Sequence, residues 1–254
     1  KLADAIQKMG LTYSVITVVN RDDMEDGGAS HYRKCLDEVH KRVPEVNLEL
    51  LCSDLSGNLN ALEDLLDNAP LQVFAHNVET VPRLTPRVRD PRATFEQSIL
   101  ILKKAKEIRP DIMTKSSIML GLGETEEDLI DAFKELREAN VDLLTLGQYL
   151  APGPGYHPVV SFPTPETFDR LANMAKEMGF KAIASGPMVN EAMEASQLLM
   201  KDWGINASVW SVTSYSELHK EAEDVRRWNI LHPTSEARKS FLEKKIKKEN
   251  GPVI

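Results

Sequence analysis

The stretch SIMLGLGETEEDLIDAFKELREANVDLLTL, residues 117–146, decides the fold class because it holds a strand, a turn, a helix and a second strand in succession. Ser117–Leu120 is a short apolar strand, and Thr125 can cap a helix whose acidic first turn is favoured by the helix dipole. Three apolar residues at i, i+4 and i+7 give this helix one buried face: Leu129, Phe133 and Leu136. Asp142–Leu146 is the second strand, so the stretch predicts a strand–helix–strand unit with parallel strands.

The same alternation continues on both sides of this unit. Further strands are predicted at residues 13–19, 48–51, 72–75 and 181–184. Further helices are predicted at residues 1–10, 30–42, 58–68, 94–108 and 164–178. Strand and helix therefore alternate about six times before residue 189, which predicts an α/β fold with a mostly parallel sheet, either open or curled into a barrel.

Polar and glycine-rich segments follow several of these strands. They lie at residues 20–28, 76–80, 121–124 and 147–149. In parallel α/β folds the carboxyl ends of the strands carry the active site. Several such segments at one rim therefore indicate an enzyme.

Composition narrows the classes of function. The chain has 254 residues, a net charge of −8 and a pI near 5.4, which argues against a nucleic-acid or anionic-membrane binder. No apolar run reaches the roughly 20 residues that a membrane span needs, and the first residues lack the apolar stretch of a secretion signal. Only two cysteines are present, as expected for the reducing cytoplasm. The first residue is not methionine, so we expect a truncated amino end.

A second piece begins after Val189. All three tryptophans, Trp203, Trp210 and Trp228, lie in the last fifth of the chain, and we interpret them as the core of a small sheet. The pattern restarts with predicted helices at 190–202, 216–227 and 235–249 and a strand at 208–212. We therefore predict two domains, residues 1–189 and residues 190–254.

Six segments of the first piece, in chain order, strongly resemble lipoyl synthase: Val19–Asp23 with Asp26–Gly28, His76–Leu84, Thr114–Ser116, Met119–Thr125, Gly147–Leu150 and Ala184–Val189. The resemblance implies a radical S-adenosylmethionine enzyme with a partial (β/α)6 barrel. Such an enzyme inserts two sulfur atoms into an octanoyl chain carried by a lysine of a lipoyl carrier protein. One 4Fe–4S cluster cleaves S-adenosylmethionine, and an auxiliary cluster donates sulfur.

The chain departs from the family where the clusters are bound. The family's CxxxCxxC loop follows the first barrel strand, and this chain begins at the following helix. After the Gly-Pro-x-Val segment the family has Arg-Ser-Ser-Tyr, one serine being a cluster ligand, whereas Asn190–Met193 stand here. Ala151–Tyr156 replaces a basic stretch. We therefore expect an incomplete barrel without its first strand, and we assign no catalytic and no metal-binding residue.

The tail resembles the transketolase-like carboxyl-terminal domain of the homodimeric pyruvate dehydrogenase first component. The resemblance rests on Lys201–Gly204, Val209–Tyr215, Arg227–Pro233 and Gly251–Ile254. No GDG…N motif for thiamine diphosphate is present. Three interpretations follow: a lipoyl synthase chain inactive by itself, a non-catalytic fused or mis-assembled fragment, and a fragment of the dehydrogenase, which the missing motif disfavours.

The resemblance also implies roles for polar residues at the rim. Asp22, Asp23 and Asp26 would bind the ammonium of S-adenosylmethionine, or else form a solvated acidic turn. Alternation places Asn77 and Glu79 on one face, where they would contact the ribose or amino-acid part of the cofactor, or else form a structural pair beside His76.

The remaining candidates lie on the later strands. Lys115 points inward with a partner, or lies exposed at an edge. Gly121 and Glu124 let a ligand approach the backbone, or form a plain tight turn. Gln148 and Tyr149 line the substrate channel or cap the barrel.

Two further sets are given ordinary structural roles. The basic residues Arg83, Arg87 and Arg89 could contact the acidic carrier domain, but pairing with surface acids is favoured. Cys35 and Cys52 are interpreted as core residues.

Overall fold

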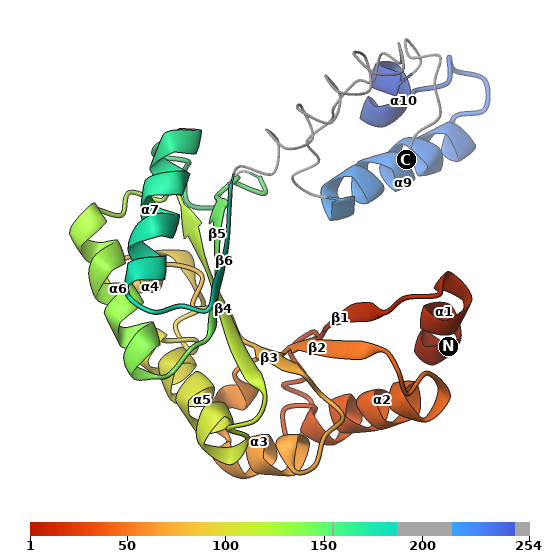
Figure 1. The fold of residues 1–254 in the computed structure, drawn as a ribbon. Helices are drawn as coiled ribbons and strands as arrows, with labels where there is room; N and C mark the ends of the chain where they lie inside the picture. Colours follow the sequence, from red (N-terminus) through yellow and green to blue (C-terminus); the bar gives the residue numbers. More distant parts are fainter. Residues whose placement is uncertain (154, 187–214, 247–254) are drawn as a thin grey trace, which may run out of the picture.

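The computed structural model describes residues 1–153, 155–186 and 215–246, with elements labelled as in Figure 1. Six strands form one sheet in chain order: β1 (Tyr13–Thr17), β2 (Asn47–Leu51), β3 (Val73–Ala75), β4 (Met113–Leu120), β5 (Leu143–Gln148) and β6 (Ala182–Gly186). Each strand pairs in parallel with the next. The sheet curls like a half-barrel (Figure 1), so the predicted α/β partial barrel is confirmed.

Helices cover the convex side of this sheet (Figure 1). They are α1 (Leu2–Met9), α2 (Ala29–Arg42), α3 (Leu59–Leu66), α4 (Thr85–Val88), α5 (Phe95–Ile108), α6 (Glu126–Glu138) and α7 (Pro165–Glu177), with a 3-10 turn η1 (Leu55–Gly57). One apolar core joins β2 and β3 to α2, α3 and α5, and a second joins β4 and β5 to α6 and α7. No helix in the described ranges is long and apolar enough to cross a membrane.

The two faces of the sheet differ in burial. Along β4, Thr114, Ser116, Ile118 and Leu120 are buried under the helices, whereas the alternate residues are partly exposed. The inner residues Tyr13 and Val15 of β1 are 46% and 50% exposed. The concave face is therefore the more exposed one at β1 and β4, whereas Val73 and Ala75 of β3 are buried.

Strand β4 begins at Met113, four residues before the predicted start. The run Thr-Lys-Ser-Ser reads as polar, but the hydroxyls that face the helices are hydrogen-bonded. Thr114 donates to the Asn140 carbonyl at 3.1 Å, and the Ser116 oxygen accepts from the Val78 amide at 3.2 Å. Bonded hydroxyls can be buried at low cost, and the strand extends accordingly.

The predicted helix at 235–249 was wrong over residues 235–240, which are not helical. Helix α10 spans Phe241–Ile246 because Ser240 starts it. The Ser240 hydroxyl accepts from the Glu243 amide at 3.2 Å, and the Glu243 carboxylate accepts from the Ser240 amide at 2.7 Å. This reciprocal pair is a capping box. Thr125 and Asp128 form the same motif at the start of α6, which confirms the predicted cap.

Trp228 lies on α9 (Tyr215–Leu231), which extends beyond the predicted helix, and it does not lie in a sheet core. Its ring stacks on His232 with centroids 4.5 Å apart, and the Arg238 guanidinium lies 3.8 Å from its centroid. The expected tryptophan core is therefore wrong for this residue, while Trp203 and Trp210 lie outside the described residues.

A buried carboxylate joins elements at the amino ends of the last strands. Asp142 is 4% exposed and accepts from Lys106 Nζ and Lys181 Nζ, both at 2.8 Å, and from the Thr114 amide at 3.0 Å. The ion pairs link α5 to the residues that precede β5 and β6, at the end of the barrel opposite the rim. The Thr114 amide adds β4 to this connection.

Candidate functional site

The carboxyl ends of β1 to β5 bring the predicted polar segments to one rim. Because all strands are parallel, the loops after Thr17, Leu51, Ala75, Leu120 and Gln148 lie at the same edge of the sheet. The segment after β3 contains Asn77 and Glu79.

Glu79 holds an unusual backbone conformation in this segment. Its φ is +66°, in the left-handed region that non-glycine residues seldom occupy. Strand β4 holds it there, because the Glu79 amide donates to the Ser117 carbonyl at 3.0 Å and its carbonyl accepts from the Met119 amide at 2.8 Å. Strain that the surroundings maintain is common at binding sites.

The Glu79 carboxylate lies with the Asn77 side chain, as alternation predicted. Burial raises the pKa of Glu79, and a hydrogen bond from Asn77 and the charge of Arg89 oppose this rise. The Glu79 carboxylate is thus largely removed from water, and a cationic or hydroxyl-bearing ligand could interact with it favourably.

Arg89 was missed as a residue of this rim. One of its terminal nitrogens donates to the Ser98 hydroxyl at 2.8 Å and to the Val78 carbonyl at 3.4 Å. Burial lowers the pKa of Arg89, while Glu79 and Asp54 raise it through their charges. Among the described residues no carboxylate forms an ion pair with it, unlike Arg83, which pairs with Asp128 at 2.7 Å. A desolvated guanidinium with unused donors is suited to an anion.

His76 and Arg89 are connected through the Ser98 hydroxyl. Its two ring nitrogens lie 2.9 Å from the Cys52 carbonyl and 2.9 Å from the Ser98 hydroxyl, and burial lowers its pKa. Both nitrogens are therefore occupied. Ser98 connects this buried ring to the guanidinium of Arg89.

Asp54 completes the arrangement on the β2 side. Its carboxylate accepts from Gln97 Nε2 at 2.6 Å and from the Ser56 amide at 3.0 Å. The charges of Asp54 and Glu79 both act on the Arg89 guanidinium and raise its pKa. This order of charges complements a zwitterion, with its ammonium at a carboxylate and its carboxylate at the arginine. The signal available in the sequence was a single aspartate three residues after the end of a strand.

The three aspartates of the β1 loop have partners within the chain. Asp23 pairs with Arg21 at 2.7 Å, and Asp22 pairs with Arg92 at 3.0 Å. Asp26 accepts from the amides of Gly28 and Ser30 at the start of α2; hydrogen bonds from Ser30 and Gly28 lower its pKa to about 2. Their predicted contact with an ammonium remains a prediction.

Glu124 folds back onto the β4 turn. Its carboxylate accepts from the amides of Gly121 and Leu122 at 2.6 and 2.9 Å. Gly121 in turn binds the segment after β5, since its carbonyl accepts from the Val160 amide at 2.8 Å. The glycine therefore allows close approach of the protein's own backbone.

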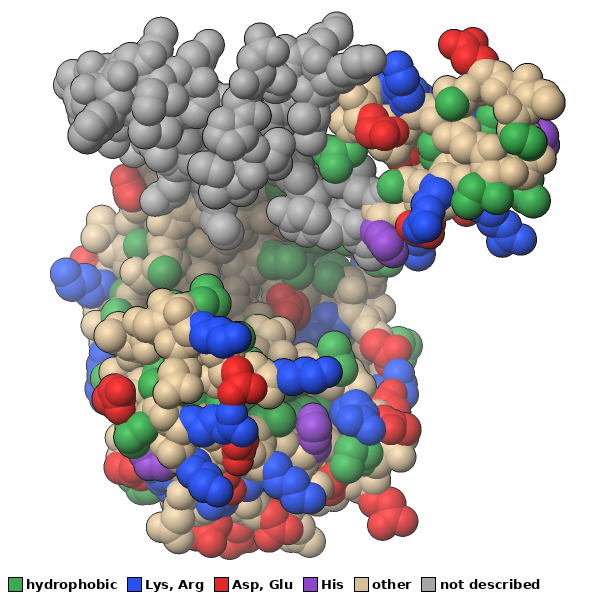
Figure 2. Space-filling view, turned by 90° about the vertical axis from the view of Figure 1, so that its right-hand side faces the viewer, with side chains coloured by type: hydrophobic (Ala, Val, Ile, Leu, Met, Phe, Trp, Pro, Cys, Tyr) green, Lys and Arg blue, Asp and Glu red, His purple; other side chains and the backbone are tan. Residues whose placement is uncertain are grey.

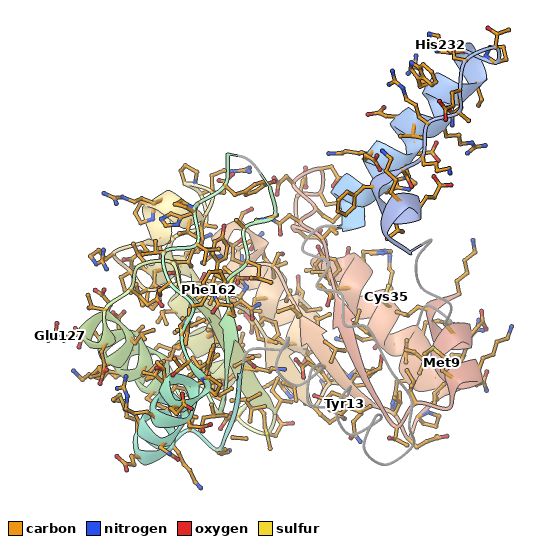
Figure 3. All side chains as sticks on the ribbon, turned by 90° about the horizontal axis from the view of Figure 1, so that it is seen from above. Met9, Tyr13, Cys35, Glu127, Phe162 and His232 are labelled. Atoms are coloured by element: carbon orange, nitrogen blue, oxygen red, sulfur yellow. The ribbon has the colours of Figure 1, made fainter. Side chains whose placement is uncertain are left out.

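Gln148 and Tyr149 secure the same segment. Gln148 Nε2 donates to the Tyr149 carbonyl at 2.8 Å and to the Ser161 carbonyl at 3.3 Å. The Tyr149 hydroxyl donates to the His157 carbonyl at 2.8 Å. Phe162, labelled in Figure 3, follows on this segment with its side chain 70% exposed. The Gln148 side-chain nitrogen and the Tyr149 hydroxyl are therefore engaged within the chain, and the role of Gln148 and Tyr149 in substrate binding stays a prediction.

Replacing Gly121 by alanine is expected to destabilise the protein by roughly 1–3 kcal/mol. The residue has φ +99°, and an added Cβ would lie 2.4 Å from the Ser161 carbonyl oxygen. The matched control is Gly147→Ala, where a Cβ meets no atom within 4 Å, and we expect a change of less than about 1 kcal/mol. Urea unfolding at pH 7 measures the stability of both variants. Equal losses of stability would contradict a close backbone approach at Gly121.

Lys115 points inward, one of its two predicted orientations. Its Nζ lies 2.8 Å from Glu49 Oε1, and the Tyr13 hydroxyl donates to Glu49 Oε2 at 2.5 Å. Glu49 is 3% exposed. Glu49 was not among the predicted site residues, although it is a lone acid within the apolar strand Leu48–Leu51.

The residues of this chain do not fit an iron–sulfur cluster. Cys52 is buried, and burial raises the pKa of its thiol to about 12, so it is no ready thiolate. Cys35 lies on α2 (Figure 3), with its sulfur 3.8 Å from His31 Nε2. Within the described ranges, no three His, Cys, Asp or Glu residues gather as a metal site.

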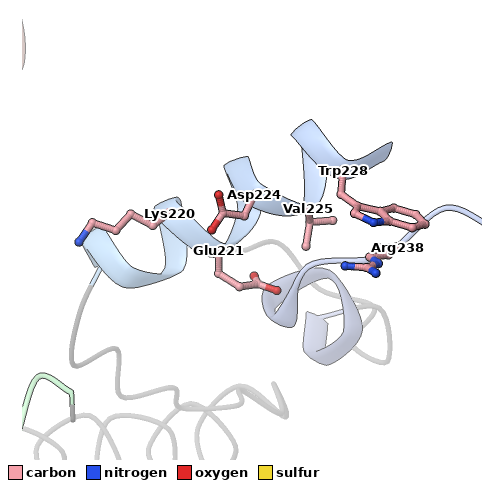
Figure 4. Close-up of a pocket in the computed structure, with 6 residues that line it drawn as sticks. All are labelled: Lys220, Glu221, Asp224, Val225, Trp228 and Arg238. Carbon is pink, nitrogen blue, oxygen red and sulfur yellow. The ribbon is translucent and has the colours of Figure 1, made fainter. Parts of the chain in front are cut away.

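A surface pocket lies between α9 and the segment that precedes α10 (Figure 4). Its lining residues are Lys220, Glu221, Asp224, Val225, Trp228 and Arg238. Charges of both signs line it, and nothing in it indicates a particular ligand. Elsewhere, Figure 2 shows acidic and basic side chains interleaved on the face in view.

Comparison with known proteins identifies the family. Residues 1–136, more than half of the chain, match the Radical SAM superfamily. The chain belongs to the radical SAM superfamily. Residues 170–250 match the transketolase-like TK C-terminal domain. That match starts within α7 of the radical SAM barrel, and the predicted boundary at residues 189 and 190 lies outside the described residues.

Among curated relatives, the lipoyl synthase of Thermus thermophilus is 48% identical over 201 residues, covering 79% of this chain and 62% of the relative. The mitochondrial lipoyl synthase of Bos taurus is 48% identical over 200 residues, covering 79% and 54%. The radical SAM chain thus spans about three fifths of the length of these relatives. The crystal structure of methylornithine synthase shares the fold, with a TM-score of 0.54 and 13% identity over 93% of this chain and 73% of that one.

Proposed function

We propose that residues 1–186 are the barrel of a lipoyl synthase and bind S-adenosylmethionine at the carboxyl ends of β2, β3 and β4. The observation that carries this proposal is Arg89, whose guanidinium donates to Ser98 and Val78 and has no ion-pair partner among the described residues. The charges of Asp54 and Glu79 act on this guanidinium. Arg89 would hold the carboxylate of the ligand. Glu79 and Asp54 would receive its ammonium, and Asn77 its ribose hydroxyls.

The proposal covers binding and not the full reaction. S-adenosylmethionine supplies the family's radical chemistry when a 4Fe–4S cluster reduces it, and the two cysteines of this chain do not fit such a cluster. We infer that this chain by itself binds the cofactor and does not insert sulfur. An octanoylated lipoyl carrier domain is the partner that the relationship suggests.

The tail favours no second activity. Its similarity to a transketolase-like domain supports a fused chain, and the part of the tail that the structure describes comprises only α9, α10 and their connection. The cytoplasm remains the proposed compartment, although some relatives carry mitochondrial or apicoplast names.

Replacing Glu79 by glutamine is expected to weaken S-adenosylmethionine binding about 10- to 100-fold, because a charge-assisted contact to the ammonium is lost. The wild-type affinity should also fall as the pH is lowered toward the raised pKa of Glu79, and the variant should lack this fall. Isothermal titration calorimetry on the full chain measures both effects.

The control is Glu107→Gln, which removes an exposed surface carboxylate of α5 paired with Lys104 at 2.5 Å. Its affinity should match wild type. Equal affinity in the Glu79 variant, or no binding by wild type at any pH from 6 to 8, would refute the proposed site.

A further inference from the structure

Glu49 is a buried acid on the concave face of the sheet. Its neighbours Leu48 and Leu50 pack under the helices, so Glu49 points to the concave side, yet it is 3% exposed. Its two partners cover it: the Tyr13 hydroxyl at 2.5 Å and Lys115 Nζ at 2.8 Å. We call these three residues the polar floor.

Strand register explains how the floor closes across three strands. Lys115 is level with Ala75 on β3 and Leu51 on β2, and Glu49 lies two residues before Leu51. The lysine must therefore cross β3 to reach the carboxylate. Ala75 has only a methyl group there, which leaves room for the crossing.

The concave surface between the floor and the rim is uncharged. Beyond Lys115 toward the rim, the strand positions of this face on β4 and β5 carry small or apolar side chains: Ser117, Met119, Thr145 and Gly147. Thr17, Leu51, Ala75 and Leu143 are also uncharged and are level with Lys115. Lys115 and Met119 are four residues apart on β4, so the layer is about 13 Å deep there at roughly 3.3 Å per residue. Above it lie Glu79 and Arg89. An uncharged layer between two polar ones fits a short alkyl chain.

The polar floor opposes the insertion of an alkyl chain beyond the uncharged layer. Lys115 uses one N–H on Glu49 and is partly exposed, with 31% of its side chain accessible. An alkyl chain placed over it would remove water from an ammonium without replacing the hydrogen bonds. A site built this way discriminates against longer chains by penalty.

We propose that Tyr13, Glu49 and Lys115 form the floor of an acyl-chain site on the concave face and limit the length of the chain that it accepts. This inference rests on the proposed function, since an acylated lysine peptide is the ligand considered. The floor acts by position and takes part in no bond-making step.

The test replaces the ion pair by apolar groups of similar size in the double variant Glu49→Leu/Lys115→Met, which avoids an unpaired buried charge. Affinities for hexanoyl-, octanoyl- and decanoyl-lysine peptides are measured on the full chain with saturating S-adenosylmethionine. Wild type should bind the octanoyl peptide more tightly than the decanoyl peptide. The variant should improve the decanoyl-to-octanoyl ratio about fifteenfold, at roughly fourfold per added methylene.

A second variant leaves the floor intact and fills the layer above it. Ser117→Leu should abolish the preference for the octanoyl peptide and favour the hexanoyl peptide. If the double variant does not fold, this variant alone tests whether the polar floor limits chain length. An unchanged length preference in whichever variants fold overturns the floor. If the wild type binds S-adenosylmethionine but none of the peptides, only the proposed floor is overturned. If it binds neither ligand, the proposed function is refuted as well.

Discussion

Replacing Asp142 by alanine is expected to lower the free energy of unfolding at pH 7 by about 3 kcal/mol. Its carboxylate is nearly buried and accepts from two lysines and a backbone amide, so its loss leaves Lys106 and Lys181 without their counter-ion and the Thr114 amide without an acceptor. Lys181 is 59% exposed and can turn to water, which keeps the loss at the lower end of the range for buried pairs. Urea unfolding measures it.

The effect has a defined pH dependence. Burial raises the pKa of Asp142, but hydrogen bonds from Lys106 and Lys181 outweigh it and leave the pKa below 3.8. A carboxyl with a depressed folded-state pKa stabilises above its unfolded pKa and loses this contribution as the pH falls through the folded value. The difference between wild type and variant should therefore be full at pH 7 and shrink below about pH 4.

The control for this variant is Asp131→Ala, which removes an exposed pair with Lys134 on α6. It should change stability by no more than about 0.5 kcal/mol. Two results would contradict a stabilising role for the ion pairs of Asp142 with Lys106 and Lys181. One is a loss of stability below 1 kcal/mol for Asp142→Ala, and the other is a difference in stability from wild type that stays constant down to pH 3.

Replacing Arg89 by methionine is expected to weaken S-adenosylmethionine binding about 100-fold or more, because the ligand carboxylate loses its charged, forked donor. Arg89→Lys should recover part of the affinity, since it restores the charge without the fork. Calorimetric titration of the full chain measures both variants.

The matched control is Arg87→Met, two residues away on the exposed face of α4. It should leave affinity unchanged. Similar losses for Arg87 and Arg89 would indicate general electrostatic attraction, and unchanged affinity in Arg89→Met would remove the guanidinium from the site.

The order and parallel direction of the six strands followed from local pattern. Apolar runs, caps such as Thr125 and the regular alternation with helices depend on near neighbours, which the sequence displays. Strand β4 was predicted too short because Thr114 and Ser116 owe their burial to partners on Asn140 and Val78, distant in sequence. A run of polar residues in the sequence does not reveal hydrogen-bond partners that lie far away along the chain.

The site was only partly predictable for the same reason. Asn77 and Glu79 lie together as alternation required, because they follow one strand. Arg89 looked like a surface residue beside Arg83 and Arg87, and only the fold brings it to Ser98 and the rim. Likewise, Lys115 was a candidate, but its partner Glu49 lies 66 residues away across β3.

Hydrogen–deuterium exchange of the full chain with and without S-adenosylmethionine, followed by mass spectrometry, would locate the cofactor site. We expect slower exchange in peptides that cover residues 52–57, 76–80 and 87–92, and unchanged exchange over 215–246. Unchanged exchange in the first three regions under saturating ligand, or protection confined to the tail, would contradict a cofactor site built on Asp54, Glu79 and Arg89.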